Sequence, residues 1–202
     1  LGFTAYEDNR PDEALAWFER VIKEHPDSTL YPDSWMMIGE FHFQKGSWEE
    51  ARKAYANVLS DPDSPVFDLA LFKSAWCDWK LGDTRQAALR FKQVLDLAAE
   101  AEKSGSYEQR KRRQQLRSQA LEYLIVVFTE DEKVTAKDAY DFLASIGGER
   151  YSREVITKLA DTFYGQTRYD RAIEADRFLI DLHRLPAGAA KFRIAIVGSY
   201  LS

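Results

Sequence analysis

Residues 51–55 read ARKAY, and a small residue followed four positions later by an aromatic ring occurs twice more at a regular interval. The matching stretches are ALAWF at 14–18 and AALRF at 87–91, so Ala14, Ala51 and Ala87 are 37 and 36 residues apart. A fixed period of this size is typical of stacked supersecondary units. Because the apolar residues of each copy recur at helical spacing, the sequence predicts an all-α solenoid.

Helix breakers separate the repeated stretches. Asn9 and Pro11 divide the first helix pair, Gly46 the second and Gly82 the third. Ser47 with Glu50 predicts a capping box at the start of one helix, and Asp83 with Gln86 predicts a cap at another.

These signals predict about five helix pairs and a terminal helix in a single solenoid over residues 1–202, which we expect to be a fragment of a longer chain. The expected units are 1–30, 31–64, 65–104, 107–148 and 151–186, with a partial unit at 187–202. The fourth unit is irregular, with one long helix after the break at 104–106.

Composition restricts the class of protein. The 202 residues are 45% hydrophobic and 30% charged, with a net charge of −5, which indicates a folded chain rather than a disordered one. The negative charge argues against affinity of the whole protein for nucleic acid or anionic membranes. No apolar stretch reaches the ~20 residues of a membrane span. The single cysteine, Cys77, has no disulfide partner and is predicted to be a small buried residue.

The second unit resembles the tetratricopeptide repeat. Residues 35–42 carry Trp, Ile, Gly and His at the spacing of that family's first helix, 51–55 carry the Ala and Tyr of its second, and Pro62 follows. The resemblance covers essentially the whole chain. It implies a right-handed superhelix whose concave groove is lined by the first helix of each pair, and a non-catalytic role in binding proteins.

The period of 36 residues and the connectors HPDS at 25–28 and YPDS at 31–34 are also similar to those of bacterial cell-envelope proteins. Examples are the periplasmic coordinator of the Tol–Pal system and the lipoprotein of the outer-membrane β-barrel assembly machine. This likeness implies a periplasmic or outer-membrane-associated role in assembly, and related repeats occur in motility and secretion machines. The alternative is a regulatory domain of a cytoplasmic protein.

An aromatic series with a few acids is predicted to line the groove, where it would bind a peptide with apolar anchors. Glu40 and Asp161 are expected to select basic residues of the ligand. Aromatic residues at helical spacing equally fit a second interpretation, in which they fill the core between helices. The predicted groove residues are Tyr6, Glu40, Phe43, Trp76, Trp79, Phe128, Asp161 and Tyr164.

Three acids depart from the repeat pattern at positions that usually hold an aromatic ring: Asp78, Glu130 and Asp176. A buried, unpaired carboxylate costs several kcal/mol. Asp176 is therefore solvated, paired with a base, or part of a unit that packs differently, and we expect solvation.

The segment 103–117 is strongly basic. Its residues Arg110, Lys111, Arg112, Arg113 and Arg117 form a possible patch for an acidic partner, a phosphate or an anionic lipid surface. The simpler interpretation, which we favour, is the solvated face of a long inserted helix.

Catalysis is not predicted. The sequence has no nucleophile elbow, phosphate loop or HExxH motif, and its three histidines lack metal-ligand spacing, so no enzyme, cofactor or metal is expected. The predicted function is a scaffold that binds a peptide or protein partner, with nucleic acid disfavoured. The alternative is a structural module that links subunits through its outer surface or its ends.

Overall fold

The computed structural model describes residues 1–130 and 133–183, and all regular structure within them is helical. The helices are α1 (Gly2–Glu7), α2 (Pro11–Glu24), α3 (Tyr31–Gln44), α4 (Trp48–Val58), α5 (Phe67–Lys80), α6 (Thr84–Ser104), α7 (Tyr107–Glu130), α8 (Ala136–Ser145), η1 (Glu149–Tyr151), α9 (Ser152–Gly165) and α10 (Tyr169–His183). The all-α prediction is confirmed. The terminal helix predicted at 187–202 lies outside the described residues.

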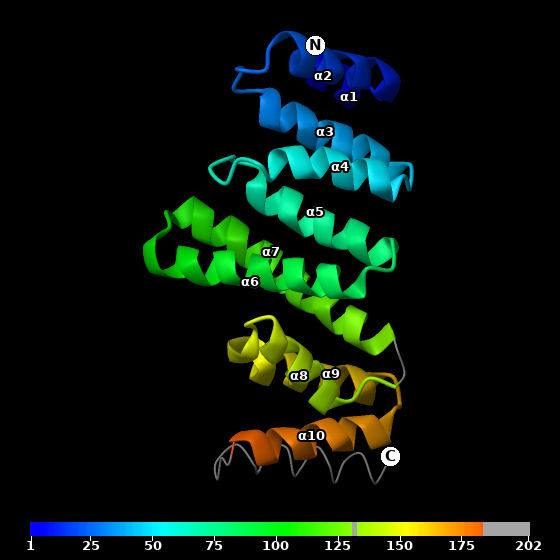
Figure 1. Cartoon of the computed structure of the whole chain (residues 1–202), viewed down its shortest axis with the longest axis vertical. Coiled ribbons are helices and arrows are strands. Elements are labelled where there is room, and N and C mark those ends of the chain that lie inside the picture. Colours follow the sequence, from blue (N-terminus) through cyan, green and yellow to red (C-terminus); the bar gives the residue numbers. More distant parts are fainter. Residues whose placement is uncertain (131–132, 184–202) are drawn as a thin grey trace. The chain divides into compact units, whose positions relative to one another are not determined.

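The chain divides into two compact units, residues 1–120 and 121–202. In the first unit, α1–α2, α3–α4 and α5–α6 are antiparallel hairpins, and each helix packs against the next along the chain (Figure 1). A single solenoid that extends over all 202 residues stays a prediction.

The first and second hairpins each complete their cores with residues of the next hairpin. One buried cluster joins Ala14 and Phe18 of α2 to Ile38 of α3. A second joins Tyr55 of α4 to Cys77 of α5. A core divided between successive hairpins is the defining property of a solenoid, since no hairpin can bury its apolar surface alone.

The predicted breaks coincide with backbone conformations that few residues adopt. Gly46 and Gly82, each just after a first helix, have φ of +72° and +82°, and Asn9 has φ of +57°. The Asp83 side chain accepts a hydrogen bond from the Gln86 backbone N–H, as predicted. The capping box at Ser47 was wrong, because the Ser47 side chain makes no capping hydrogen bond although α4 begins directly after it.

The second unit contains the remainder of α7 with α8, η1, α9 and α10. Its core joins Ala136 of α8 to Ile156 of α9 and Leu179 of α10. Thr135 and Asp138 form a capping box at the start of α8 that the sequence analysis did not identify.

Two acids at expected aromatic positions are buried. Asp176 is only 5% exposed, so the solvated interpretation was wrong. Asp78 is 0% exposed and forms ion pairs with Arg90 of α6 and with Arg52 of α4, the latter at 3.3 Å between Nη1 and Oδ1. Burial raises the pKa of Asp78, while both arginines act against that shift. Three successive helices thus meet at one carboxylate.

Cys77 is buried, as predicted. We expect its burial to make the free energy of unfolding depend on pH. Burial, followed by the nearby Asp78, raises the pKa of Cys77 from 9.0 to about 12. The folded chain therefore holds the thiol proton more tightly than the unfolded chain does. The free energy of unfolding should be unaffected below pH 9.0 and should fall by at most about 1.4 kcal/mol per pH unit above it.

Urea unfolding from pH 9.0 upward measures this effect. The Tyr55 phenol, whose pKa is also raised by burial from an ordinary value of 10.0, adds a second slope that begins about one pH unit higher. The Cys77→Ala variant should lose the part of the slope that begins near pH 9.0 and keep the part that Tyr55 causes. An equal slope in that variant would contradict the assignment to the thiol.

Candidate functional site

Four aromatic side chains of α3, α4 and α5 form a continuous series, which we call the aromatic ladder: Trp48, Phe43, Trp76 and Trp79. Successive ring centroids are 5.1, 5.9 and 5.2 Å apart, and each pair meets edge to face. Phe43, Trp76 and Trp79 are half-buried, so they are neither enclosed in the core nor fully exposed. Three of the four were predicted groove residues, and Trp48 was not.

Lysine side chains lie over the rings of the ladder. The Lys73 ammonium is 4.4 Å from the Phe43 centroid. The Lys80 ammonium is 4.1 Å from the Trp79 centroid and 5.3 Å from that of Trp76. Such cation–π contacts contribute about 0.5–1 kcal/mol at exposed sites. Neither lysine was predicted to belong to the site, although Lys73 and Lys80 lie three residues before and four after Trp76, at the spacing that places them on its face of α5.

Glu40 has partners within its own chain. Its Oε1 accepts a hydrogen bond from the Tyr55 hydroxyl at 2.6 Å, and its Oε2 lies 3.0 Å from Lys73 Nζ. Burial, followed by the Glu40 charge, raises the pKa of Tyr55, so the phenol keeps its proton and remains a donor. The carboxylate thus links α3 to α4 and α5. Since both oxygens are occupied, the expectation that Glu40 selects basic ligand residues needs revision.

Tyr6, on α1, is an exposed aromatic residue outside the ladder. Its side chain is 38% exposed, and its hydroxyl accepts a hydrogen bond from Gln44 Nε2 at 2.9 Å. This hydrogen bond joins α1 of the first hairpin to Gln44, the residue after Phe43 in α3 of the second hairpin. Tyr6 therefore does not have the core position that the alternative interpretation gave it.

The remaining predicted groove residues belong to the second compact unit, residues 121–202. Asp161 and Tyr164 of α9 are exposed, and the Tyr164 ring lies 5.5 Å from that of Tyr169. Phe128 is only 6% exposed and packs against Phe142 at 5.7 Å, so it is a core residue. Its assignment to a binding surface was wrong, because the ring is buried and packs against Phe142 of α8.

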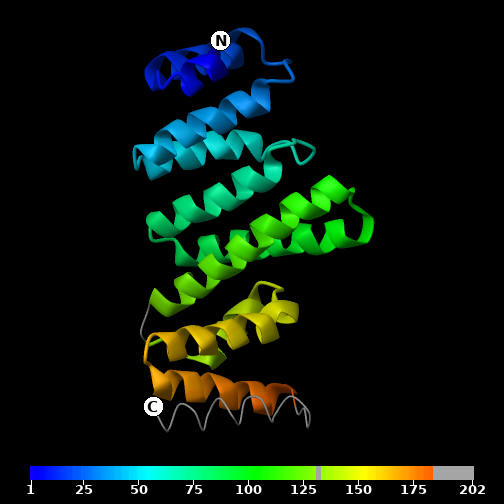
Figure 2. The same cartoon turned by 180° about the vertical axis from the view of Figure 1, so that it is seen from behind.

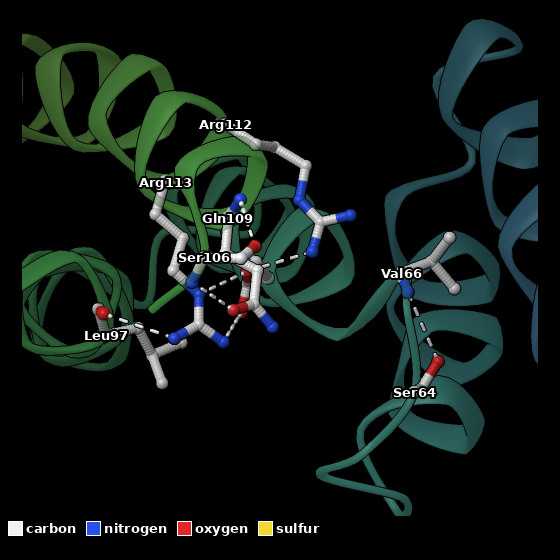
Figure 3. A network of polar contacts seen from close by, with 8 residues as sticks. Ser64, Val66, Leu97, Ser106, Gln109, Arg112 and Arg113 are labelled. Atoms are coloured by element: carbon white, nitrogen blue, oxygen red, sulfur yellow. Dashed lines mark hydrogen bonds and ion pairs between the residues drawn. The ribbon is translucent and has the colours of Figure 1, made fainter. Parts of the chain in front are cut away.

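The basic patch is largely engaged by the chain itself. Figure 3 shows Arg112 and Arg113 extending from α7 toward the same network of polar groups. Arg113 binds the buried Asp68 carboxylate with Nε at 2.7 Å and Nη2 at 3.3 Å, and Arg112 Nη2 is 3.5 Å from Oδ2. Arg113 also donates to the Leu97 carbonyl at 3.4 Å.

This network fastens the start of α7 to α5 and α6, and Figure 2 shows α7 beginning alongside the end of α6. Arg110 donates to the Gly105 carbonyl at 2.7 Å, and Lys111 is exposed. Arg117 is half-buried. Three of the five cations are exposed, namely Arg110, Lys111 and Arg112, whereas Arg113 and Arg117 are half-buried, so a patch of five exposed cations is not present. Asp68 of α5 pairs with Arg112 and Arg113.

Within residues 1–130 and 133–183, no three His, Cys, Asp or Glu side chains are grouped closely enough to hold a metal ion. In the same residues, no helix combines the length and hydropathy that a membrane span requires.

The hairpins of the first compact unit match a known sequence repeat. Residues 1–65 and 69–100 match the sequence pattern of the tetratricopeptide repeat. Both matches lie within the first hundred residues. The matched segments contain α1 to α4, α5 from residue 69 onward and most of α6, and hence the whole aromatic ladder. Tetratricopeptide repeats generally mediate protein–protein interaction, and typically without catalysis.

One solved structure is similar along the whole chain. It is a thermophilic tetratricopeptide-repeat protein of Thermus thermophilus, which is 15% identical and matches over 100% of this chain and 96% of its own. The TM-score is 0.31, which is too low to support a conclusion about the fold.

Proposed function

We propose that the protein is a non-catalytic scaffold that binds a peptide segment or protein surface at the aromatic ladder. The observation that supports this most directly is the ladder itself, in which half-buried rings of three neighbouring helices lie in edge-to-face contact within tetratricopeptide repeats. Aromatic rings offer a large contact area at low entropy cost and are enriched at binding hot spots.

Replacing Trp76 with alanine tests the proposal. The central ring contacts both Phe43 and Trp79, so its loss should weaken partner binding by about 2 kcal/mol, or roughly thirtyfold. The measurement is affinity capture by the full-length protein from its native cell, with mass spectrometry of the captured proteins, followed by titration of the partner.

Trp17→Ala is the matched control, since Trp17 is a half-buried tryptophan of α2 outside the ladder. Melting curves of both variants establish that each is folded. Undiminished capture by a folded Trp76→Ala variant would contradict the proposal.

The proposed setting is a bacterial cell-envelope machine for assembly, motility or secretion. Support comes from the period of 36 residues and the HPDS and YPDS connectors at 25–28 and 31–34. Fractionation of cells that express the full-length gene tests this setting, with the protein expected in the periplasm or with the outer membrane. Recovery in the cytoplasmic fraction would instead favour a regulatory role there.

A second candidate function is suggested by the end of the first hairpin. Leu1, Phe3 and Leu30 are exposed there, beside a mainly apolar hollow of about 470 Å³ that Trp17 also lines. An exposed apolar surface of this kind is typical of an interaction site. In this alternative the protein links subunits through its end and the ladder stays unoccupied. Loss of capture in Trp17→Ala together with full capture in Trp76→Ala would favour it.

A further inference from the structure

Resting on the proposed function, we infer that the ladder takes an acidic peptide segment, with Lys80 binding a carboxylate of the ligand while Trp76 and Trp79 contact an adjacent apolar side chain. This reverses the charge preference expected from Glu40. Three features of the site support the inference: the occupied ring faces, the neutralised Glu40, and the charge of Lys80, which has no ion-pair partner in residues 1–130 and 133–183.

The ring faces of the ladder are already covered by cations. Aromatic faces attract positive charge, whereas ring edges carry the positive end of the quadrupole. Lys73 lies over Phe43, and Lys80 lies over Trp79 and Trp76. A basic ligand side chain would compete with these lysines for the same faces and would be repelled by their charges. An anion would instead meet the ammonium groups.

The charges of Glu40 and Lys73 cancel each other. Their ion pair is 3.0 Å long, and the side chains are only 21% and 22% exposed. The second oxygen of Glu40 is bound by Tyr55. Glu40 therefore adds no net negative potential for a basic ligand, and Lys73 is held in place by the carboxylate.

Lys80 is the cation that remains. It is exposed at the last position of α5. Among the residues that the structure describes, no carboxylate lies within ion-pair distance of its ammonium. A lysine at a helix end also interacts favourably with the helix dipole, but this effect does not require its placement over two indole rings.

The spacing of Lys80 and Trp76 limits the form of the ligand. The Lys80 ammonium lies 5.3 Å from the Trp76 centroid, so a carboxylate on the ammonium and an apolar group on the ring must be close together in the ligand. In an extended peptide, side chains two positions apart point to the same side and are about 6.6 Å apart. The expected motif is therefore an apolar residue and an acidic residue separated by one position.

A displayed library of random peptides, selected on the purified full chain, tests this inference. The selected peptides should be enriched in an apolar and an acidic residue two positions apart. Their affinity should fall about threefold in Lys80→Gln, because an exposed ion pair contributes up to about 1 kcal/mol. It should fall further in Lys80→Glu and weaken as salt concentration rises. Lys53→Glu, a change at an exposed lysine of α4, is the matched control and should leave binding unchanged. A library selected on Lys80→Glu should favour basic peptides.

The outcomes separate the two proposals. If the selected peptides lose binding in Trp76→Ala but show no acidic preference or are indifferent to Lys80→Glu, the inference about charge is wrong and the ladder remains a binding site. If the library gives no binder, or only binders that are indifferent to Trp76→Ala and Phe43→Ala, the proposed function is wrong and the inference falls with it.

Discussion

Replacing Asp78 with alanine is expected to lower the free energy of unfolding of the first unit by about 3 kcal/mol. The Asp78 carboxylate has no exposed surface and lies between Arg52 of α4 and Arg90 of α6. Its removal leaves both guanidinium groups without their common partner. This loss of free energy is at the lower end of the range for a broken buried ion pair, because the side chains of Arg52 and Arg90 are 34% and 21% exposed to solvent.

Tryptophan fluorescence during urea unfolding measures this loss in the correct part of the chain. All five tryptophans lie within residues 1–120, so their emission follows the first unit alone. Asp78→Asn keeps the shape of the side chain and should lose less stability than Asp78→Ala. Asp12→Ala removes an exposed acid that is 3.5 Å from Lys45 and should change stability by less than about 0.5 kcal/mol. Equal stability of Asp78→Ala and Asp12→Ala would contradict the prediction.

Replacing Gly39 with valine should also destabilise the first unit by about 3 kcal/mol. A Cβ atom at this position would lie 2.3 Å from Tyr55 Cε1 and 2.6 Å from Cδ1, far inside van der Waals contact. The Tyr55 ring cannot retreat, because it is fully buried and its hydroxyl is bound to Glu40. Helices α3 and α4 must therefore separate. Gly39→Ala should cost less, since alanine gains about 1 kcal/mol of helix propensity.

A double-mutant cycle identifies the cause of this effect. In a Tyr55→Val background the clash is absent, so Gly39→Val should cost much less than it does beside tyrosine. Gly165→Ala in α9 is the control, because a Cβ there would meet no atom within 4 Å. It should not destabilise the second unit, as followed by circular dichroism. Additive effects in the cycle would show that the Tyr55 ring is not what excludes a side chain at position 39.

The helices could be predicted from local signals. Gly46, Gly82 and Asn9 mark turns because their backbone conformations are open to few residues, and this requirement is visible in the sequence itself. The cap at Asp83 was identified for the same reason. Ser47 shows the limit of such reasoning, since a suitable residue at a cap position need not make the capping bond.

The candidate site was only partly predictable, because partners distant in sequence decide its charges. Arg113 and Asp68 are 45 positions apart, and Lys73 and Glu40 are 33 apart. No local pattern connects either pair, so the arginines were read as a surface patch and Glu40 as a ligand-binding acid. Phe128 was misassigned because the repeat register does not hold in the irregular fourth repeat, which was expected at 107–148. Lys80 could have been found, since it lies one helical turn from Trp76.

The meeting of Arg52, Asp78 and Arg90 has a consequence for how this chain can evolve. Repeat arrays commonly lengthen by duplicating a module, which succeeds when every junction accepts any neighbour. Here the junction between α4 and α5 is matched by charge, so a transplanted α5–α6 hairpin would keep its Asp78–Arg90 pair but lose Arg52, and a transplanted α3–α4 hairpin would bring Arg52 without its acid. Inserting a hairpin between α4 and α5 should therefore cost more stability than inserting one at a purely apolar junction.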